Sequence, residues 1–132
     1  MSAKRENRKV QRIKLDLPLK VTMGSIGAEM RYELETKNLS INGFFLAFDK
    51  PGRFPFTPAS IMEVWLKLDE QQTIFFNGKM ARVVHPGDPA AHDTGPGIAI
   101  RIVQIDRDNE THLRDFISRV SGEASSKGEY VA

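Results

Sequence analysis

The sequence predicts a mainly β domain, a small six-stranded antiparallel barrel or sandwich followed by one C-terminal helix. Three observations support this fold class: segments in which apolar and polar residues alternate, turn residues between them, and a change to helical spacing near the C-terminus. The chain has 132 residues, of which 40% are hydrophobic and 27% charged, which suits one domain with a packed core. It has no cysteine, which indicates a reducing compartment.

The expected strands are short and are separated by turn residues. In the first, every second residue from Leu15 to Met23 is apolar, and Pro18 removes one backbone donor, which predicts an edge strand or a bulge. Asn77-Gly78 marks a turn or a bulge within the fifth strand. The six strands are expected at residues 14–23, 30–37, 44–48, 61–68, 73–85 and 97–105.

The C-terminal segment has the periodicity of an amphipathic helix. Asp106 or Asp108 is expected to cap its start, and Gly122 to end it. We therefore expect a flexible basic arm over residues 1–13, a barrel with its helix over 14–120, the helix being about 107–120, and a frayed polar tail over 121–132. The residues that share the apolar helical face are Leu113, Phe116, Ile117 and Val120.

The positive charge of the chain is concentrated at its N-terminus. Residues 1–14 contain six cationic side chains and one acidic side chain, a local balance of +5, whereas the whole chain has a net charge of +2. A basic arm on a mildly acidic body is typical of proteins with a polyanionic partner. No leader-like or membrane-spanning apolar run is present, so we expect a cytoplasmic protein without membrane insertion.

A polar corner interrupts the apolar pattern at Lys37-Asn38-Leu39-Ser40-Ile41-Asn42-Gly43-Phe44-Phe45-Leu46. Asn42-Gly43 between apolar runs is a strong hairpin signal, but a hairpin explains neither Asn38 nor Ser40. These two side chains are two residues apart in an expected strand, so they point to the same face. Because Gly43 lets a ligand approach the backbone, the corner is a candidate recognition surface.

The sequence gives no indication of catalysis or metal binding. His85, His92 and His112 lack the spacing of metal ligands, and we expect them on the surface. Neither a nucleophile motif nor a phosphate-binding glycine loop is found. We therefore expect no enzyme activity, no catalytic residue, no metal and no cofactor.

The basic arm and the polar corner together resemble the PilZ domain family. Its signature is RxxxR before the barrel, matched by Arg8 and Arg12, followed by (D/N)xSxxG, matched by Asn38, Ser40 and Gly43. One departure from the commonest form is the amide of Asn38 in place of a carboxylate. Further segments that resemble the family are residues 13–19, 81–85 and 97–103, and the expected helix.

The resemblance implies a six-stranded barrel of the split-barrel type that binds cyclic di-GMP, a bacterial second messenger with two guanines and two phosphodiesters. Arg8 and Arg12 would clamp the nucleotide, because guanidinium groups match phosphates and the O6/N7 edge of guanine. Asn38 and Ser40 would contact the ligand, and Gly43 would shape the corner. The implied function is a receptor or adaptor that orders its arm on binding and signals to an unidentified protein, as a monomer or a ligand-dependent homodimer.

Other readings of the sequence remain open. One is a PilZ-like interaction module that acts without nucleotide, which the intact arginines disfavour. Another is a barrel that binds single-stranded nucleic acid, which would need exposed aromatic residues for base stacking. A flavin-binding split barrel is disfavoured because no phosphate loop is found. His85, at the end of a late strand, is a weaker candidate for an additional ligand contact.

Overall fold

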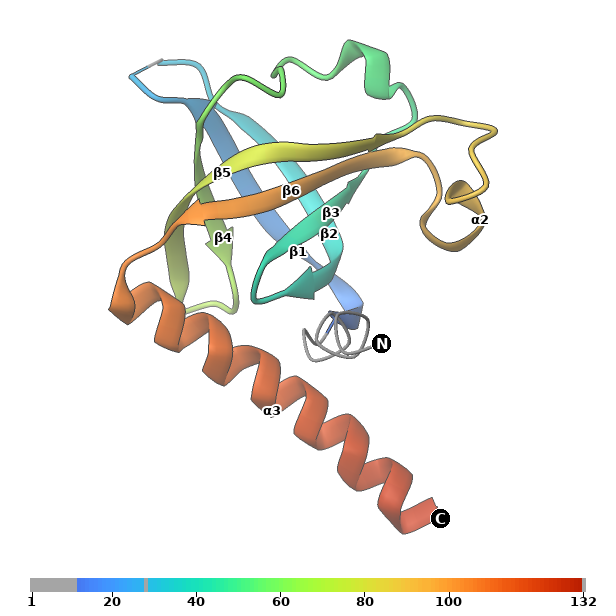
Figure 1. The fold of residues 1–132 in the computed structure, drawn as a ribbon. Helices are drawn as coiled ribbons and strands as arrows, with labels where there is room; N and C mark the ends of the chain where they lie inside the picture. Colours follow the sequence, from blue (N-terminus) through green and yellow to red (C-terminus); the bar gives the residue numbers. More distant parts are fainter. Residues whose placement is uncertain (1–11, 28, 132) are drawn as a thin grey trace, which may run out of the picture.

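A closed six-stranded antiparallel barrel with one long C-terminal helix forms the domain (Figure 1). The structure is a computed structural model that describes residues 12–27 and 29–131. Around the barrel the strand order is β1-β2-β3-β6-β5-β4, and β1 closes it by pairing with both β2 and β4. The strands are β1 (Arg12–Ser25), β2 (Tyr32–Ser40), β3 (Gly43–Ala47), β4 (Met62–Lys67), β5 (Thr73–Val84) and β6 (Gly97–Gln104).

The helical elements are η1 (Pro51–Arg53), α2 (Ala91–Thr94) and α3 (Arg107–Val131). The predicted barrel and its C-terminal helix are therefore confirmed, and the sandwich alternative is excluded because the sheet closes on itself. Within the described part of the chain, no helix combines the length and apolar character needed to cross a membrane.

The alternating apolar residues predicted from the sequence fill the barrel interior. In β4, Met62, Val64 and Leu66 are fully buried, whereas Trp65 lies on the outer face. The loop that carries η1 covers one end of the barrel, where Phe54 packs edge to face against Phe56 at 5.4 Å. Other fully buried core side chains are Val21, Met23, Leu39, Leu46, Ile74, Phe76 and Ile98.

Leu17 departs from the predicted alternation, since 78% of its surface is exposed. The register between β1 and β2 shifts between Lys14 and Leu19, and this irregularity includes Pro18. Proline cannot donate to a ladder, and β1 pairs with β4 only from Val21 onward, so one side of the strand is open at Pro18. The strand is irregular there, and Leu17 is exposed. A second register shift lies between Asn77 and Gly78 in the pairing of β5 with β6, and the residue it leaves without a partner is Val103 of β6. Asn77-Gly78 is therefore part of a continuous strand opposite a bulge in β6, and it is not a turn.

Helix α3 lies against the other end of the barrel through Leu113, Phe116 and Ile117, which are all buried. Asp106 caps it, because its Oδ1 accepts the backbone N–H of Asn109 at 2.8 Å. The helix continues to Val131, beyond the end predicted near Gly122. One glycine costs only about 1 kcal/mol in a helix interior, which does not by itself end a helix.

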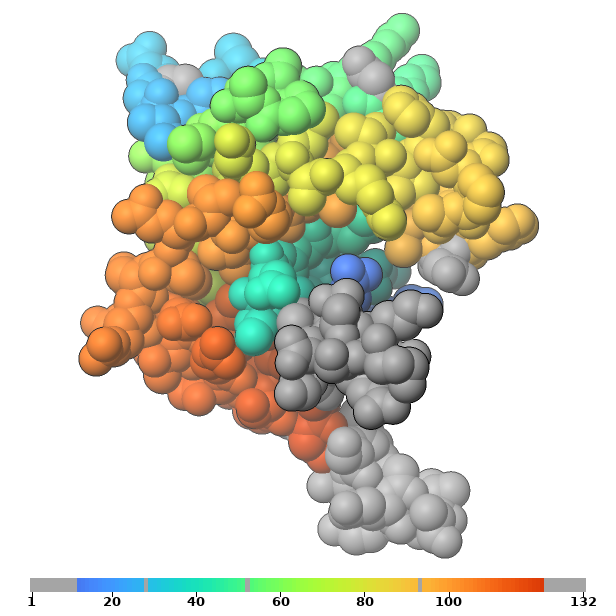
Figure 2. All heavy atoms as spheres, viewed as in Figure 1, coloured from blue at the N-terminus to red at the C-terminus, as the bar shows by residue number. Residues whose placement is uncertain are grey.

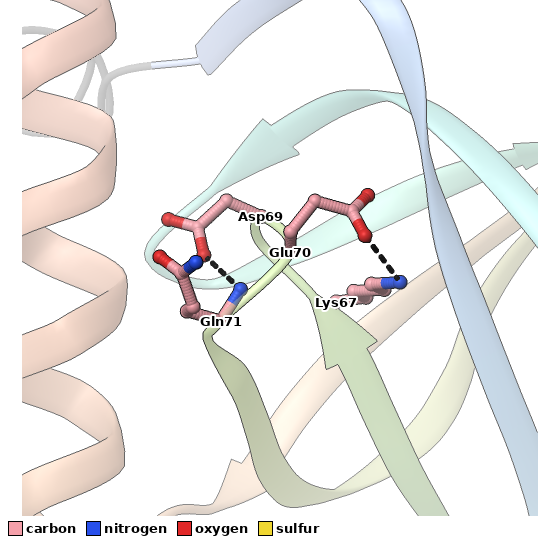
Figure 3. A network of polar contacts seen from close by, with 4 residues as sticks. All are labelled: Lys67, Asp69, Glu70 and Gln71. Atoms are coloured by element: carbon pink, nitrogen blue, oxygen red, sulfur yellow. Dashed lines mark hydrogen bonds and ion pairs between the residues drawn. The ribbon is translucent and has the colours of Figure 1, made fainter.

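The turn between β4 and β5 lies beside helix α3 (Figure 3). Asp69 Oδ1 accepts the backbone N–H of Gln71 at 2.8 Å, and Lys67 Nζ lies 3.5 Å from Glu70 Oε1. Asp69 also lies 3.9 Å from the guanidinium of Arg119 in α3. The turn is therefore held both by its own side chains and by a contact with the helix.

Candidate functional site: a cationic cavity at the β2–β3 corner

The polar corner is a tight connection between β2 and β3. Ser40 pairs with Gly43, so Ile41 and Asn42 are the two central residues of the turn. The sequence had suggested Asn42 and Gly43 for these two positions, one residue too far along the chain. The Ser40 hydroxyl accepts the backbone N–H of Asn42 at 3.1 Å and donates to the carbonyl of Gly43 at 3.4 Å. Ser40 is nearly fully buried, and its hydroxyl stabilises the turn.

Gly43 fits its position because the backbone of β6 leaves no room for a side chain. A Cβ atom there would overlap the carbonyl oxygen of Ile100 and would lie 3.1 Å from Cα of Arg101. The neighbouring turn is also joined to β6, since the backbone N–H of Ile102 donates to the carbonyl of Asn42 at 2.7 Å. The corner is therefore fixed to the barrel wall on its β6 side.

The start of β1 brings cationic side chains to the same corner. Arg12 pairs with Ser40, and Lys14 pairs with Asn38, across the antiparallel ladder between β1 and β2. Directly opposed residues of such a ladder have Cβ atoms about 4.5–5.5 Å apart. Arg12 was expected in the arm, but it belongs to β1, so its backbone is anchored to the barrel.

These residues line an open cavity of about 410 Å³ on the outer face of the barrel. Its far wall comes from β5 and β6, through Arg82 and Arg101. Figure 2 shows the turquoise atoms of the β2–β3 corner below the orange β6, with darker teal atoms set back in a hollow beside them, under the yellow-to-gold segment that follows β5. Described residues that line the cavity include Arg12, Lys14, Asn38, Ser40, Asn42, Gly43, Phe45, Arg82, Thr94, Ala99, Ile100 and Arg101.

The charge of this cavity is uniformly positive among the described residues. Four cations line it, and no described lining residue is acidic. None of these four cations forms an ion pair with another described residue. The described cations that do form ion pairs lie elsewhere, and they are Arg31, Lys67, Arg114 and Arg119. Since unpaired cations around a concave surface focus the electrostatic potential, the cavity favours an anionic ligand. The four cations are Arg12, Lys14, Arg82 and Arg101.

Polar and apolar groups complete the cavity. Asn38 is half-buried, and its carboxamide forms no hydrogen bond with any described residue, so it is available to a ligand. Phe45 forms an apolar floor and lies over Gly97, where a Cβ would come within 2.6 Å of the ring. A second hollow of about 750 Å³ adjoins the first and shares Lys14, Asn38, Phe45 and Thr94 with it.

Of the five residues singled out in the sequence, four come together here: Arg12, Asn38, Ser40 and Gly43. The fifth, Arg8, lies outside the described residues. The three histidines, including His85, are exposed, and none lines the cavity. Sequence reasoning missed Lys14, Arg82 and Arg101. Lys14 reaches the corner through the register of β1 with β2, and Arg82 and Arg101 reach it only because the closure of the barrel brings β5 and β6 next to the corner.

A closed six-stranded antiparallel barrel with one C-terminal helix and a cationic cavity defines the structural class of this domain. Within this class, the chain belongs to the PilZ domain family, since the family profile matches residues 6–119. Domains of this family are receptor or adaptor modules. The chain has no significant match among curated protein sequences.

Solved structures with the same fold include three of which this chain spans about half the length. The complex of Escherichia coli YcgR with c-di-GMP has a TM-score of 0.69 at 14% identity, over 95% of this chain and 50% of that one. The Klebsiella pneumoniae MrkH–c-di-GMP complex has a TM-score of 0.69 at 17% identity, over 91% and 54%. The Bacillus subtilis inhibitor of motility, MotI/DgrA, has a TM-score of 0.63 at 17% identity, over 87% and 52%.

Proposed function

We propose that this protein is a receptor for cyclic di-GMP and that the cavity at the β2–β3 corner binds the nucleotide. One observation carries this proposal: four cationic side chains and the carboxamide of Asn38 line the same open cavity. None of the four cations forms an ion pair with a described residue, and the carboxamide forms no hydrogen bond with one. Cyclic di-GMP has two phosphodiesters and two guanines, so it needs both cationic and hydrogen-bonding groups. The structures of YcgR and MrkH with c-di-GMP add support, because they contain barrels of this fold.

Each proposed contact follows from the chemistry of the side chain. Arg12 stands on a strand at the cavity rim, where its guanidinium can bind a phosphate or the O6/N7 edge of guanine in bidentate geometry. The carboxamide of Asn38 has both donors and an acceptor for a guanine edge. Arg8, by its place in the RxxxR motif, supplies the second clamp. Ser40 and Gly43 act mainly by holding the corner in shape, since the Ser40 hydroxyl is bonded within the turn.

The proposal extends to signalling. When Arg8 engages the bound nucleotide, the N-terminal segment is drawn onto the cavity, and the changed surface is recognised by a downstream protein or by a second copy of the chain. The identity of that partner is left open. No enzyme activity is part of this proposal.

Calorimetric titration with cyclic di-GMP tests the proposal. Wild type should bind at micromolar concentration or tighter, and Arg12→Ala or Arg8→Ala should weaken binding about ten- to a hundredfold, the effect of losing a hydrogen-bonded charged contact. Arg53→Ala is the matched control, because Arg53 is an exposed arginine outside the cavity and should leave binding unchanged.

Two further ligands sharpen the test. GMP should bind far more weakly, because it lacks the second base and the cyclic diester, and cyclic di-AMP should bind more weakly because adenine has no O6 acceptor. Absence of binding to wild type, checked at two temperatures to exclude a near-zero enthalpy, would reject the receptor. A protein-interaction module that acts without nucleotide would then be the better description.

A further inference from the structure

A bulge in β2 changes which side chains of that strand face the cavity. Thr36 pairs with Leu46 of β3, and Asn38 pairs with Phe45, so Lys37 has no partner in β3. The pairing with β1 is interrupted at the same place, since Thr36 pairs with Leu19 and Asn38 with Lys14. Such a bulge inserts one residue into the strand and changes the direction in which later side chains point.

Burial along β2 shows that the alternation of inward and outward side chains shifts by one residue at the bulge. Thr36 is 2% exposed and Leu39, three residues later, is also 2% exposed and belongs to the hydrophobic core. In a regular strand inward positions are two residues apart, so Asn38 would have faced the interior and Leu39 the solvent. The bulge at Lys37 therefore places Leu39 inside and turns Asn38 toward the cavity.

The hydroxyl of Thr36 spans this bulge. Thr36 Oγ1 lies 2.6 Å from the carbonyl oxygen of Phe45 and 2.9 Å from that of Asn38, and its one hydrogen serves these two acceptors. The same oxygen accepts the backbone N–H of Asn38 at 3.3 Å. A bulge leaves ladder groups unpaired, and unpaired buried backbone groups are costly, so this hydroxyl stabilises the irregular backbone.

We propose that Thr36 is a positioning residue for nucleotide recognition, acting through the backbone of Asn38. Thr36 itself is buried and does not line the cavity. Its hydroxyl fixes the bulge that aims the Asn38 carboxamide at the ligand. The effect on affinity rests on the proposed cyclic di-GMP function, whereas the effect on the bulge does not depend on it.

Thr36→Val is the direct test, because valine has nearly the same shape and lacks the hydroxyl. Affinity for cyclic di-GMP should fall about tenfold, the equivalent of one lost hydrogen bond. Thr36→Ser keeps the hydroxyl and should restore most of the affinity. Thr22→Val, in the part of β1 that pairs with β4 and outside the cavity lining, is the matched control and should bind like wild type.

A double-mutant cycle shows whether Thr36 acts through Asn38. In an Asn38→Ala background, Thr36→Val should have little additional effect on affinity, because the group that it orients is gone. An undiminished effect in that background, or wild-type affinity in Thr36→Val alone, would overturn the inference.

Amide hydrogen exchange by NMR gives a readout that needs no ligand. In Thr36→Val the Asn38 N–H should exchange faster, since its acceptor is lost, while amides in the centre of β4 and β5 keep their protection. Unchanged protection of Asn38 would overturn the inference even if wild type bound no nucleotide. Failure of wild type to bind, with faster exchange at Asn38, would reject the proposed ligand and retain the role of Thr36 in the bulge.

Discussion

Gly43 and Ile100 approach each other across the β3–β6 ladder so closely that a side chain at Gly43 would overlap the Ile100 carbonyl oxygen. Both are backbone positions of paired strands, so neither can move without breaking ladder hydrogen bonds. The glycine of the polar corner is therefore required by packing between strands as well as by the shape of the cavity.

Gly43→Ala should consequently destabilise the fold. We expect the free energy of unfolding to fall by about 2 kcal/mol, the usual scale of overpacking in a close-packed site. Chemical denaturation followed by tryptophan fluorescence measures this change. Gly122→Ala is the control, since a Cβ there meets nothing within 4 Å and alanine favours the helix. Equal stability of Gly43→Ala and wild type would show that the strands can separate at no cost.

The two arginines on the far wall should contribute to nucleotide affinity. Arg82 and Arg101 line the cavity without an ion pair to any described residue, so removing either one takes positive potential away from the ligand. Arg82→Ala and Arg101→Ala should each weaken cyclic di-GMP binding about three- to tenfold, and the double substitution more, as judged by calorimetry. Lysine at either position should retain part of the affinity. If the double variant bound like wild type, the ligand would lie only on the β1–β2 side.

The sequence could predict the strands because their core positions alternate, as the fully buried Val64 and Leu66 show on either side of Trp65. It could also predict that Asn38 and Ser40 share a face, since both line one cavity. The face that they share, however, depends on the bulge at Lys37, which no local pattern indicates. Such a bulge is specified by pairing with two other strands.

The cations of the far wall illustrate the same limit. Arg101 lies in the last expected strand, residues 97–105, but nothing nearby in sequence connects it with the polar corner. Its neighbour there is Gly43, a residue far away along the chain, and the pair forms only when β3 meets β6. Local alternation therefore assigns a face to each residue, and the closure of the barrel assigns its neighbours.

The attachment of helix α3 should depend on Asn109. Its side-chain oxygen accepts the backbone N–H of Phe75 in β5 at 3.1 Å, so the first turn of the helix is bonded to the barrel. Asn109→Ala would leave that partly buried N–H without its acceptor, and we expect a loss of about 1–2 kcal/mol of unfolding free energy. Denaturation curves measure the loss. Asp115→Ala, on an exposed position of the same helix, should be nearly neutral, and a similar loss there would argue against a specific contact.

The cap of the same helix should make stability depend on pH in the acid range. The backbone N–H of Asn109, followed by its side-chain amide, holds the pKa of Asp106 below its ordinary value of 3.8. Because the pKa is lower in the folded state, the carboxylate stabilises the fold above its unfolded pKa. That contribution is lost as the pH falls through the folded pKa.

Asp106→Asn isolates this contribution, because asparagine also caps helices but does not titrate. Thermal denaturation of both proteins between about pH 2 and 7 should show a stability difference that is constant above about pH 5 and shrinks as the pH falls below about 4. Both proteins will lose stability in acid as other carboxylates are protonated, so the difference between them is the quantity to follow. A difference that stayed constant down to the lowest pH would show that the Asp106 carboxylate is no better stabilised in the folded protein than in the unfolded chain.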